Sequence, residues 1–212
     1  MSILKNPAAE FWNERYKQSE FAYGLEPSTF LVKHLSKIPT HGNVLFPAEG
    51  EGRNAVYAAT KGLNVEAFDY SSEGKKKALS FAQKHETTIE YHVGDLEELE
   101  FEPISFDAVV LVYAHFLPEI RERYHREFVD LLKPGGFIIL EAFNKKQLEY
   151  NSVNPKSGGP KTADMLFDKE ILRSDFSELE EVELLEEITH IKEGQYHDGE
   201  ASLIRFLGKK HL

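Results

Sequence analysis

The stretch NVLFPAEGEGRNA, from Asn43 to Ala55, decides the fold class of this chain. Its first five residues predict a buried strand, and a helix is predicted from Gly52 to about Lys61. Glycines between a strand and a helix let the backbone approach a ligand that a Cβ atom would block. We expect the N-terminus of this helix to offer free N–H groups to a carboxylate or a phosphate.

Outward from this stretch, strands and helices alternate, which indicates an α/β domain with a parallel sheet. The apolar run at 106–114 is typical of a central strand buried on both faces. Pro118 favours the start of a helix, which the sequence Lys133-Pro134-Gly135-Gly136 ends. Further strands are predicted at 64–70, 88–93 and 137–143, and further helices at 7–18, 27–35 and 71–85.

The last third of the sequence has a different character. Residues 145–165 are rich in Asn, Lys, Gly, Ser and Pro and are too long for an ordinary connection, so they form either a lid or a surface excursion. A short helix is predicted at 168–176. Strands at 182–191 and 201–207, joined by a link containing Gly194 and Gly199, predict an antiparallel hairpin. We expect one domain, 1–212, with a helical cap at 1–40 and an active-site loop at 144–166.

Composition excludes several classes of protein. The 212 residues contain no cysteine, so disulfides, thiolate nucleophiles and iron–sulfur clusters are excluded. The net charge of −11 disfavours nucleic acid and anionic membranes as partners. No apolar run approaches a membrane span, no signal peptide is evident, and the histidines lack metal-ligand spacing. We expect a cytoplasmic, metal-free monomer or weak homodimer that acts on a small molecule.

Two acidic residues follow predicted strands. Asp69 lies at the end of the second strand, where a carboxylate accepts both hydroxyls of a ribose, and Asp95 follows the third strand, where it would meet an adenine amine. Strand ends share one crevice in such sheets, so an adenosine-type cofactor is favoured. The pattern Gly50-x-Gly52-x-x-Ala55 also satisfies the dinucleotide motif, which leaves NAD open. The predicted terminal hairpin disfavours NAD because a second parallel half is missing.

The segments VLFPAEGEGRNA, AFDYS, VGDL, FDAVVLVYAHF and LKPGGFIIL resemble the class I S-adenosylmethionine-dependent methyltransferases. Within the class, EGEGRNAVYAA, NSVNPKSGGPK and EGQYHDGEASLIRFLG are similar to the tellurite-resistance and thiopurine methyltransferases. The resemblance covers about 7–207. It implies a Rossmann-like, mostly parallel seven-stranded sheet with helices on both faces. The implied strand order is 3-2-1-4-5-7-6, with strand 7 antiparallel.

The resemblance also implies S-adenosylmethionine as the cofactor and assigns its contacts. Two departures stand out: Phe46 or Pro47 replaces the usual acidic residue of the first strand, and Ala48 replaces the first glycine. Glu49 supplies a carboxylate that would compensate. The implied cofactor-binding residues are Trp12, Tyr16, Tyr23, Ala48, Glu49, Gly50, Gly52, Arg53, Asn54, Asp69, Tyr70, Ser71, Gly94, Asp95, Leu96, Val112 and Tyr113.

The chemistry requires alignment of nucleophile, methyl group and sulfur in one line. A thiol or metalloid oxyanion needs little help from a base, whereas a hydroxyl or protonated amine needs one. His115 is the leading candidate base, with backbone hydrogen bonding as its alternative role. Tyr196 and His197 are further catalytic candidates, with turn chemistry as their alternative. Arg53 would bind an anionic group or form a salt bridge, and Lys161 would attract an anion or stay solvated.

Three hypotheses follow. The first is a methyltransferase that moves a methyl group to a small-molecule acceptor, such as a thiol or a metalloid oxyanion, by in-line displacement. The second is an NAD-dependent oxidoreductase, which an antiparallel strand 7 would disfavour. The third is a non-catalytic S-adenosylmethionine-binding protein, suggested by Ala48 and by the missing acidic residue of the first strand.

Overall fold

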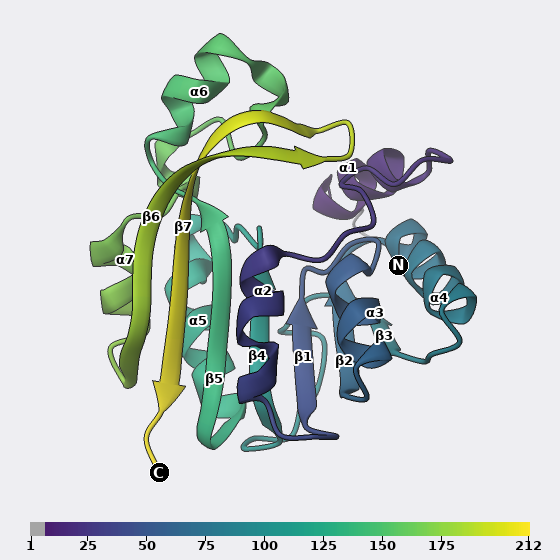
Figure 1. Ribbon diagram of the computed structural model, residues 1–212, viewed down its shortest axis with the longest axis vertical. Helices are drawn as coiled ribbons and strands as arrows, with labels where there is room; N and C mark the ends of the chain where they lie inside the picture. The colour runs from purple at the N-terminus through teal and green to yellow at the C-terminus, as the bar shows by residue number, and fades with distance from the viewer. Residues whose placement is uncertain (1–6) are drawn as a thin grey trace, which may run out of the picture.

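The computed structural model describes residues 7–212, and Figure 1 shows its arrangement. Residues 1–6, the start of the predicted cap at 1–40, lie outside the described part. A seven-stranded sheet has the order β3-β2-β1-β4-β5-β7-β6, and β7 runs antiparallel to both of its neighbours, as predicted. The strands are β1 (Asn43–Pro47), β2 (Asn64–Asp69), β3 (Glu90–Val93), β4 (Phe106–Val112), β5 (Leu132–Phe143), β6 (Leu179–Glu193) and β7 (His197–Lys210).

Helices cover both faces of the sheet, and the side-chain alternation of the strands explains why. In β1, Leu45 joins the core on one face, whereas Val44 and Phe46 join the core on the other. The first core includes residues of α5 and α7, and the second includes residues of α2, α3 and α4. The helices are α1 (Pro7–Tyr16), α2 (Thr29–His34), α3 (Arg53–Thr60), α4 (Ser72–Lys84), α5 (Pro118–Leu131), α6 (Gln147–Val153) and α7 (Lys169–Asp175).

Two predictions about the last third of the chain are corrected. The predicted loop 145–165 contains α6 and two 3-10 turns, Pro155–Ser157 and Ala163–Met165. A seven-residue helix is too short to show helical periodicity in the sequence. The hairpin strands are also longer than predicted, because Gly199 pairs with Ile191 inside the ladder and does not belong to the link.

The segment after α1 is held against the turn between β6 and β7. The backbone N–H of Gln195 donates to the carbonyl of Ala22 at 3.2 Å. A Cβ atom on Gly194 would lie 2.4 Å from the same carbonyl oxygen, so this close approach requires glycine. Figure 1 shows the purple α1 next to the yellow end of the hairpin. Among the described residues, none of the helices has the length and apolar character needed to span a bilayer.

Candidate functional site

A cavity of about 480 Å³ lies where the carboxyl ends of β1, β2, β4 and β5 meet α1, the β6–β7 turn and the segment after α6. Its size is that of a small-molecule site. Most of the predicted site residues line this cavity: Trp12, Tyr16, Tyr23, Ala48, Glu49, Arg53, Asn54, Asp69, Tyr70, Val112, Tyr113, His115, Tyr196 and His197.

Six predicted cofactor-binding residues do not line the cavity: Gly50, Gly52, Ser71, Gly94, Asp95 and Leu96. Several of them support its walls. Ser71 caps α4 by accepting a hydrogen bond from Gly74 N at 3.0 Å, and Leu96 is buried in the core. Asp95 accepts a long hydrogen bond of 3.4 Å from the hydroxyl of Tyr70, which does line the cavity. The predicted contact of Asp95 with an adenine amine stays a prediction.

Packing inside the protein already requires glycine at two positions of the turn between β1 and α3, whether or not a ligand binds there. Gly52 has φ +88°, and a Cβ atom on it would lie 2.6 Å from the Cβ of Ala78 in α4. A Cβ on Gly50 would lie 2.6 Å from the hydroxyl of Tyr16. Ala48 takes the place of a glycine and still adopts a left-handed φ of 52°. That conformation costs about 1–2 kcal/mol for a residue with a Cβ.

The N-terminus of α3 is occupied by a side chain of the protein itself. Oε1 of Glu49 accepts hydrogen bonds from Asn54 N at 2.8 Å and Ala55 N at 2.9 Å. The expectation that these N–H groups are free for an anionic ligand is therefore wrong. Burial raises the pKa of Glu49 to about 7, although the two backbone N–H groups lower it.

Asp69 is the second carboxylate at this end of the cavity. It accepts hydrogen bonds from Ser71 N at 2.8 Å and Gly50 N at 3.1 Å. Burial raises the pKa of Asp69 to about 6 against the effect of these bonds. Among the described residues, no cation forms an ion pair with Asp69 or Glu49, and the charge of Arg53, which is paired with Glu193, acts on Glu49 from beyond ion-pair distance. The two carboxylates therefore suit a ligand that brings positive charge or hydroxyl donors.

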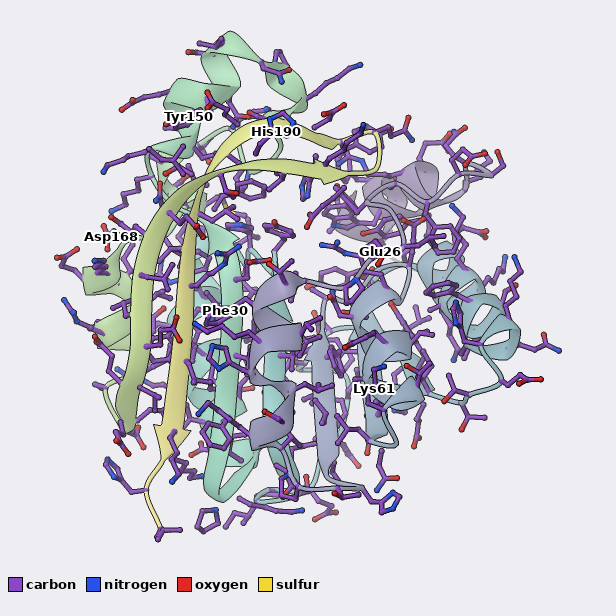
Figure 2. All side chains as sticks on the ribbon, viewed as in Figure 1. Glu26, Phe30, Lys61, Tyr150, Asp168 and His190 are labelled. Carbon is purple, nitrogen blue, oxygen red and sulfur yellow. The ribbon has the colours of Figure 1, made fainter. Side chains whose placement is uncertain are left out.

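Arg53 forms a buried ion pair with a partner that the sequence did not identify. Its Nη2 lies 3.1 Å from Oε2 of Glu193, and its Nη1 donates to the carbonyl of Glu26 at 2.8 Å. Glu26, labelled in Figure 2, belongs to the segment between α1 and α2. Of the two roles considered for Arg53, the structure shows the salt bridge. Glu193 lies 140 residues away in the chain, so no local pattern indicated their contact.

Glu193 also holds His197. Nδ1 of His197 lies 3.2 Å from Oε2 of Glu193, and its ring packs on Tyr23 with centroids 4.6 Å apart. Burial lowers the pKa of His197, although Glu193 raises it, so the imidazole is neutral at pH 7. With its proton on Nδ1 toward Glu193, the Nε2 atom retains a lone pair. No described residue forms a hydrogen bond with that atom.

His115 has a different environment. Its Nδ1 lies 2.7 Å from the carbonyl oxygen of Met165, and its Nε2 accepts a hydrogen bond from Phe143 N at 3.4 Å. Burial lowers the pKa of His115 to about 4. Both nitrogens face the backbone, which is the alternative role considered for this residue. An imidazole that is neutral and hydrogen-bonded at both nitrogens is a weak base, so His115 is better suited to lining the cavity than to accepting a proton.

Aromatic rings surround the rest of the cavity. Trp12 stacks on Tyr16 with ring centroids 5.4 Å apart, and Tyr113 stacks on Phe143 at 4.7 Å. Tyr113 has a strained φ of 54°, and its hydroxyl has no hydrogen-bond partner among the described residues. The sequence interpretation missed several lining residues, among them Arg15, Glu51, Phe116 and Phe143, whereas Gly158, Gly159, Pro160 and Met165 lie within the predicted active-site loop at 144–166. Most of these lie far in sequence from the glycine turn.

One group of described residues has the geometry of a metal site, but it lies elsewhere. Glu66, Glu90 and His92 place one possible ligand atom each within 4.8 Å of the others. They lie on β2 and β3, and none of them lines the cavity. Exposed acidic groups of this kind are common without an ion.

Residues 44–136 match the family model described as a methyltransferase domain. The ubiquinone biosynthesis O-methyltransferase of Rickettsia typhi is 26% identical over 147 residues, which cover 66% of this chain and 58% of that protein. The thiopurine S-methyltransferase of Vibrio parahaemolyticus is 28% identical over 159 residues, covering 66% of this chain and 73% of that protein. The chain spans about half the length of the ubiquinone-pathway relatives it matches.

Solved structures show the same fold. A S-adenosylmethionine-dependent methyltransferase from Methanosarcina mazei superimposes with a TM-score of 0.65 at 18% sequence identity. The superposition covers 89% of this chain and 100% of that chain. The cavity described above therefore lies in a fold that is shared with proteins of this class.

Proposed function

We propose that this chain, which carries a class I S-adenosylmethionine-dependent methyltransferase domain, transfers the methyl group of that cofactor to a small-molecule acceptor. The observation that carries the proposal is a pair of carboxylates without a cation partner among the described residues, Glu49 and Asp69, facing a cavity lined by aromatic rings. Carboxylates and ring faces are the groups that stabilise a sulfonium in a partly dry site.

The chain's residues fit the cofactor in two ways. Asp69 has the position of a ribose-binding carboxylate at the end of β2, and Trp12, Tyr16 and Tyr23 close the cavity above it. When bound, S-adenosylmethionine supplies an electrophilic methyl group on a positively charged sulfur. The cavity walls exclude water and restrict the acceptor to one direction of approach, which is most of what such a transfer requires.

His197 and Glu193 would serve an acceptor that must lose a proton. Glu193 fixes the tautomer of His197 and would stabilise the imidazolium that forms. A thiolate or a metalloid oxyanion would need only the positioning, and the likeness to a thiopurine S-methyltransferase supports a thiol. The oxidoreductase alternative loses its basis because the sheet ends in an antiparallel hairpin and not in a second parallel half.

The test is calorimetric titration with S-adenosylmethionine, S-adenosylhomocysteine and NAD, followed by methylation assays on thiols and metalloid oxyanions. We expect the first two ligands to bind and NAD not to bind. Asp69→Asn should weaken binding of both by about tenfold or more, because it removes a charged acceptor of hydroxyl groups. Glu100→Gln, an exposed carboxylate outside the cavity, is the matched control. Binding without turnover of any acceptor would favour the non-catalytic alternative.

A further inference from the structure

Two cations of the cavity have only neutral partners among the described residues. Arg15 donates from Nη1 to the hydroxyl of Tyr23 at 2.6 Å, and its guanidinium carbon lies 4.2 Å from the ring centre of Tyr196. Lys161 donates from Nζ to Oδ1 of Asn151 at 3.0 Å and makes a longer contact of 3.5 Å with the carbonyl of Pro155. Both side chains line the cavity.

The other charged groups that line the cavity either form an ion pair within the protein or are the two carboxylates Glu49 and Asp69. Arg53 is paired with Glu193, and Glu51 is paired with Lys77 at 2.7 Å. The remaining groups are two carboxylates, Glu49 and Asp69, and two cations, Arg15 and Lys161. S-adenosylmethionine brings two positive groups, its sulfonium and its ammonium, and one negative group, its carboxylate. The site's two carboxylates and two cations sum to zero, with Asp69 accepting the ribose hydroxyls, whereas the cofactor's three groups sum to one positive charge.

With the cofactor bound, the cavity therefore carries one positive charge in excess. We infer that the acceptor carries a negative group besides the atom that is methylated, and that Lys161 receives this group. The inference rests on the proposed function, since it assumes that the cofactor fills the carboxylate end. Lys161 is exposed at the edge of the cavity and has only neutral partners among the described residues, so an anionic group of the acceptor would give it a charged partner that a neutral acceptor would not.

Lys161 is assigned to the acceptor because of where its segment is held. The buried side chain of Gln147 donates to the carbonyls of Ser157 at 2.9 Å and Gly158 at 3.0 Å. Gly158 has φ +83°, and a Cβ atom on it would lie 2.4 Å from Cδ2 of His197. The segment is thus packed directly against the residue proposed to take a proton from the acceptor.

Arg15 is assigned to the cofactor side by the anchoring of its helix, although its guanidinium packs on Tyr196 and its charge acts on His197. Oδ1 of Asn13, two residues earlier in α1, accepts hydrogen bonds from the Ser71 hydroxyl at 2.7 Å and Glu73 N at 3.1 Å. Ser71 N in turn donates to Asp69, the proposed ribose-binding residue. Part of α1 is therefore anchored beside the carboxylate end of the cavity, whereas Lys161 comes from the segment after β5.

The acceptor class follows from the walls near Lys161. Phe143 lies against Gly159, where an added Cβ atom would be 2.8 Å from the ring, and Phe143 also stacks on Tyr113. Flat apolar walls beside a cation with no carboxylate partner favour a small aromatic acid. Its nucleophilic atom would point toward the cofactor and its anionic group toward Lys161. In the step itself, a lone pair of the acceptor forms the new bond to the methyl carbon and the sulfur keeps the electrons of the broken bond.

The experiment compares 4-mercaptobenzoate with 4-mercaptobenzamide, which present the same thiol and differ by one carboxylate charge. Initial methylation rates give KM for each compound. Calorimetric titration of each compound into the protein loaded with S-adenosylhomocysteine gives affinities that do not depend on turnover. We expect the acid to be preferred by about twofold to fivefold, the range of an ion pair with an exposed lysine. In Lys161→Gln the preference should fall to near one, whereas Lys161→Arg should retain it.

Lys156→Gln is the matched control, because Lys156 lies in the same segment but does not line the cavity. It should behave as the unmodified chain. The inference is overturned if the amide binds as well as the acid, if the acid shows no saturable binding, or if Lys161→Gln weakens both compounds equally. It is also overturned if Lys161→Gln weakens S-adenosylmethionine and leaves the acid unaffected. Failure of the unmodified chain to bind S-adenosylmethionine would instead contradict the proposed function.

Discussion

At the scale of the residue, Glu49 is poised to change its charge. Its pKa of about 7 means that a large fraction of these side chains carries a proton at neutral pH. A cation placed beside it would lower this pKa and release the proton. Binding of S-adenosylmethionine at pH 7 should therefore release protons, whereas S-adenosylhomocysteine, whose sulfur is uncharged, should release fewer.

The measurement is calorimetry in two buffers of different ionisation enthalpy. The difference between the two binding enthalpies should be larger for the methylated cofactor, and Glu49→Gln should reduce it, since a glutamine keeps the hydrogen bonds from Asn54 and Ala55 without titrating. Equal proton release for both cofactors would show that the positive sulfur does not act on Glu49.

The same residue makes the free protein sensitive to pH. The folded pKa is raised above its ordinary value of 4.5, so the folded state binds more protons than the unfolded state between pH 4.5 and about 7. The free energy of unfolding falls as the pH rises through this window. We expect Glu49→Gln to lose part of this fall in urea titrations at pH 5 and pH 8. A variant that kept the full pH dependence would place its origin in another group.

At the scale of the element, the segment between α6 and α7 depends on left-handed glycines. Gly158→Ala would introduce a Cβ atom at a φ of +83° and against the ring of His197. The ring or the segment must shift. We expect the methylation rate to fall by about tenfold or more, while the dissociation constant of S-adenosylmethionine changes little. Gly62→Ala, also at positive φ but with no atom closer than 3.9 Å, is a matched control for backbone strain alone.

Elements also show how far the sequence could predict this structure. The strands could be predicted from apolar runs bounded by turns, and their order in the sheet could be predicted from the family resemblance. Asp69 was placed correctly in the cavity because a strand end fixes its location. α6 was missed because seven residues are too few to show a helical period of apolar residues. The capping role of Glu49 was missed because it depends on the backbone conformation of the turn, which the sequence alone does not specify.

At the scale of the whole molecule, the Arg53–Glu193 pair connects α3 to the far end of β6. Glu193→Gln would leave a buried guanidinium uncompensated, and such losses cost about 3–5 kcal/mol. We expect a lower midpoint of urea unfolding for this variant. Adding Arg53→Met should recover part of the loss, because the unpaired charge disappears. A double variant less stable than Glu193→Gln alone would contradict this account.

The contact between Ala22 and the β6–β7 turn has a consequence for when the cavity forms during synthesis of the chain. The cavity takes its walls from the first described helix and from a hairpin that lies much later in the chain, and β7 inserts between two strands that precede it. A nascent chain has no such walls until the hairpin has emerged. Cofactor capture would therefore come only after β6 and β7 have been synthesised, and ligand binding would then stabilise the entire fold at once.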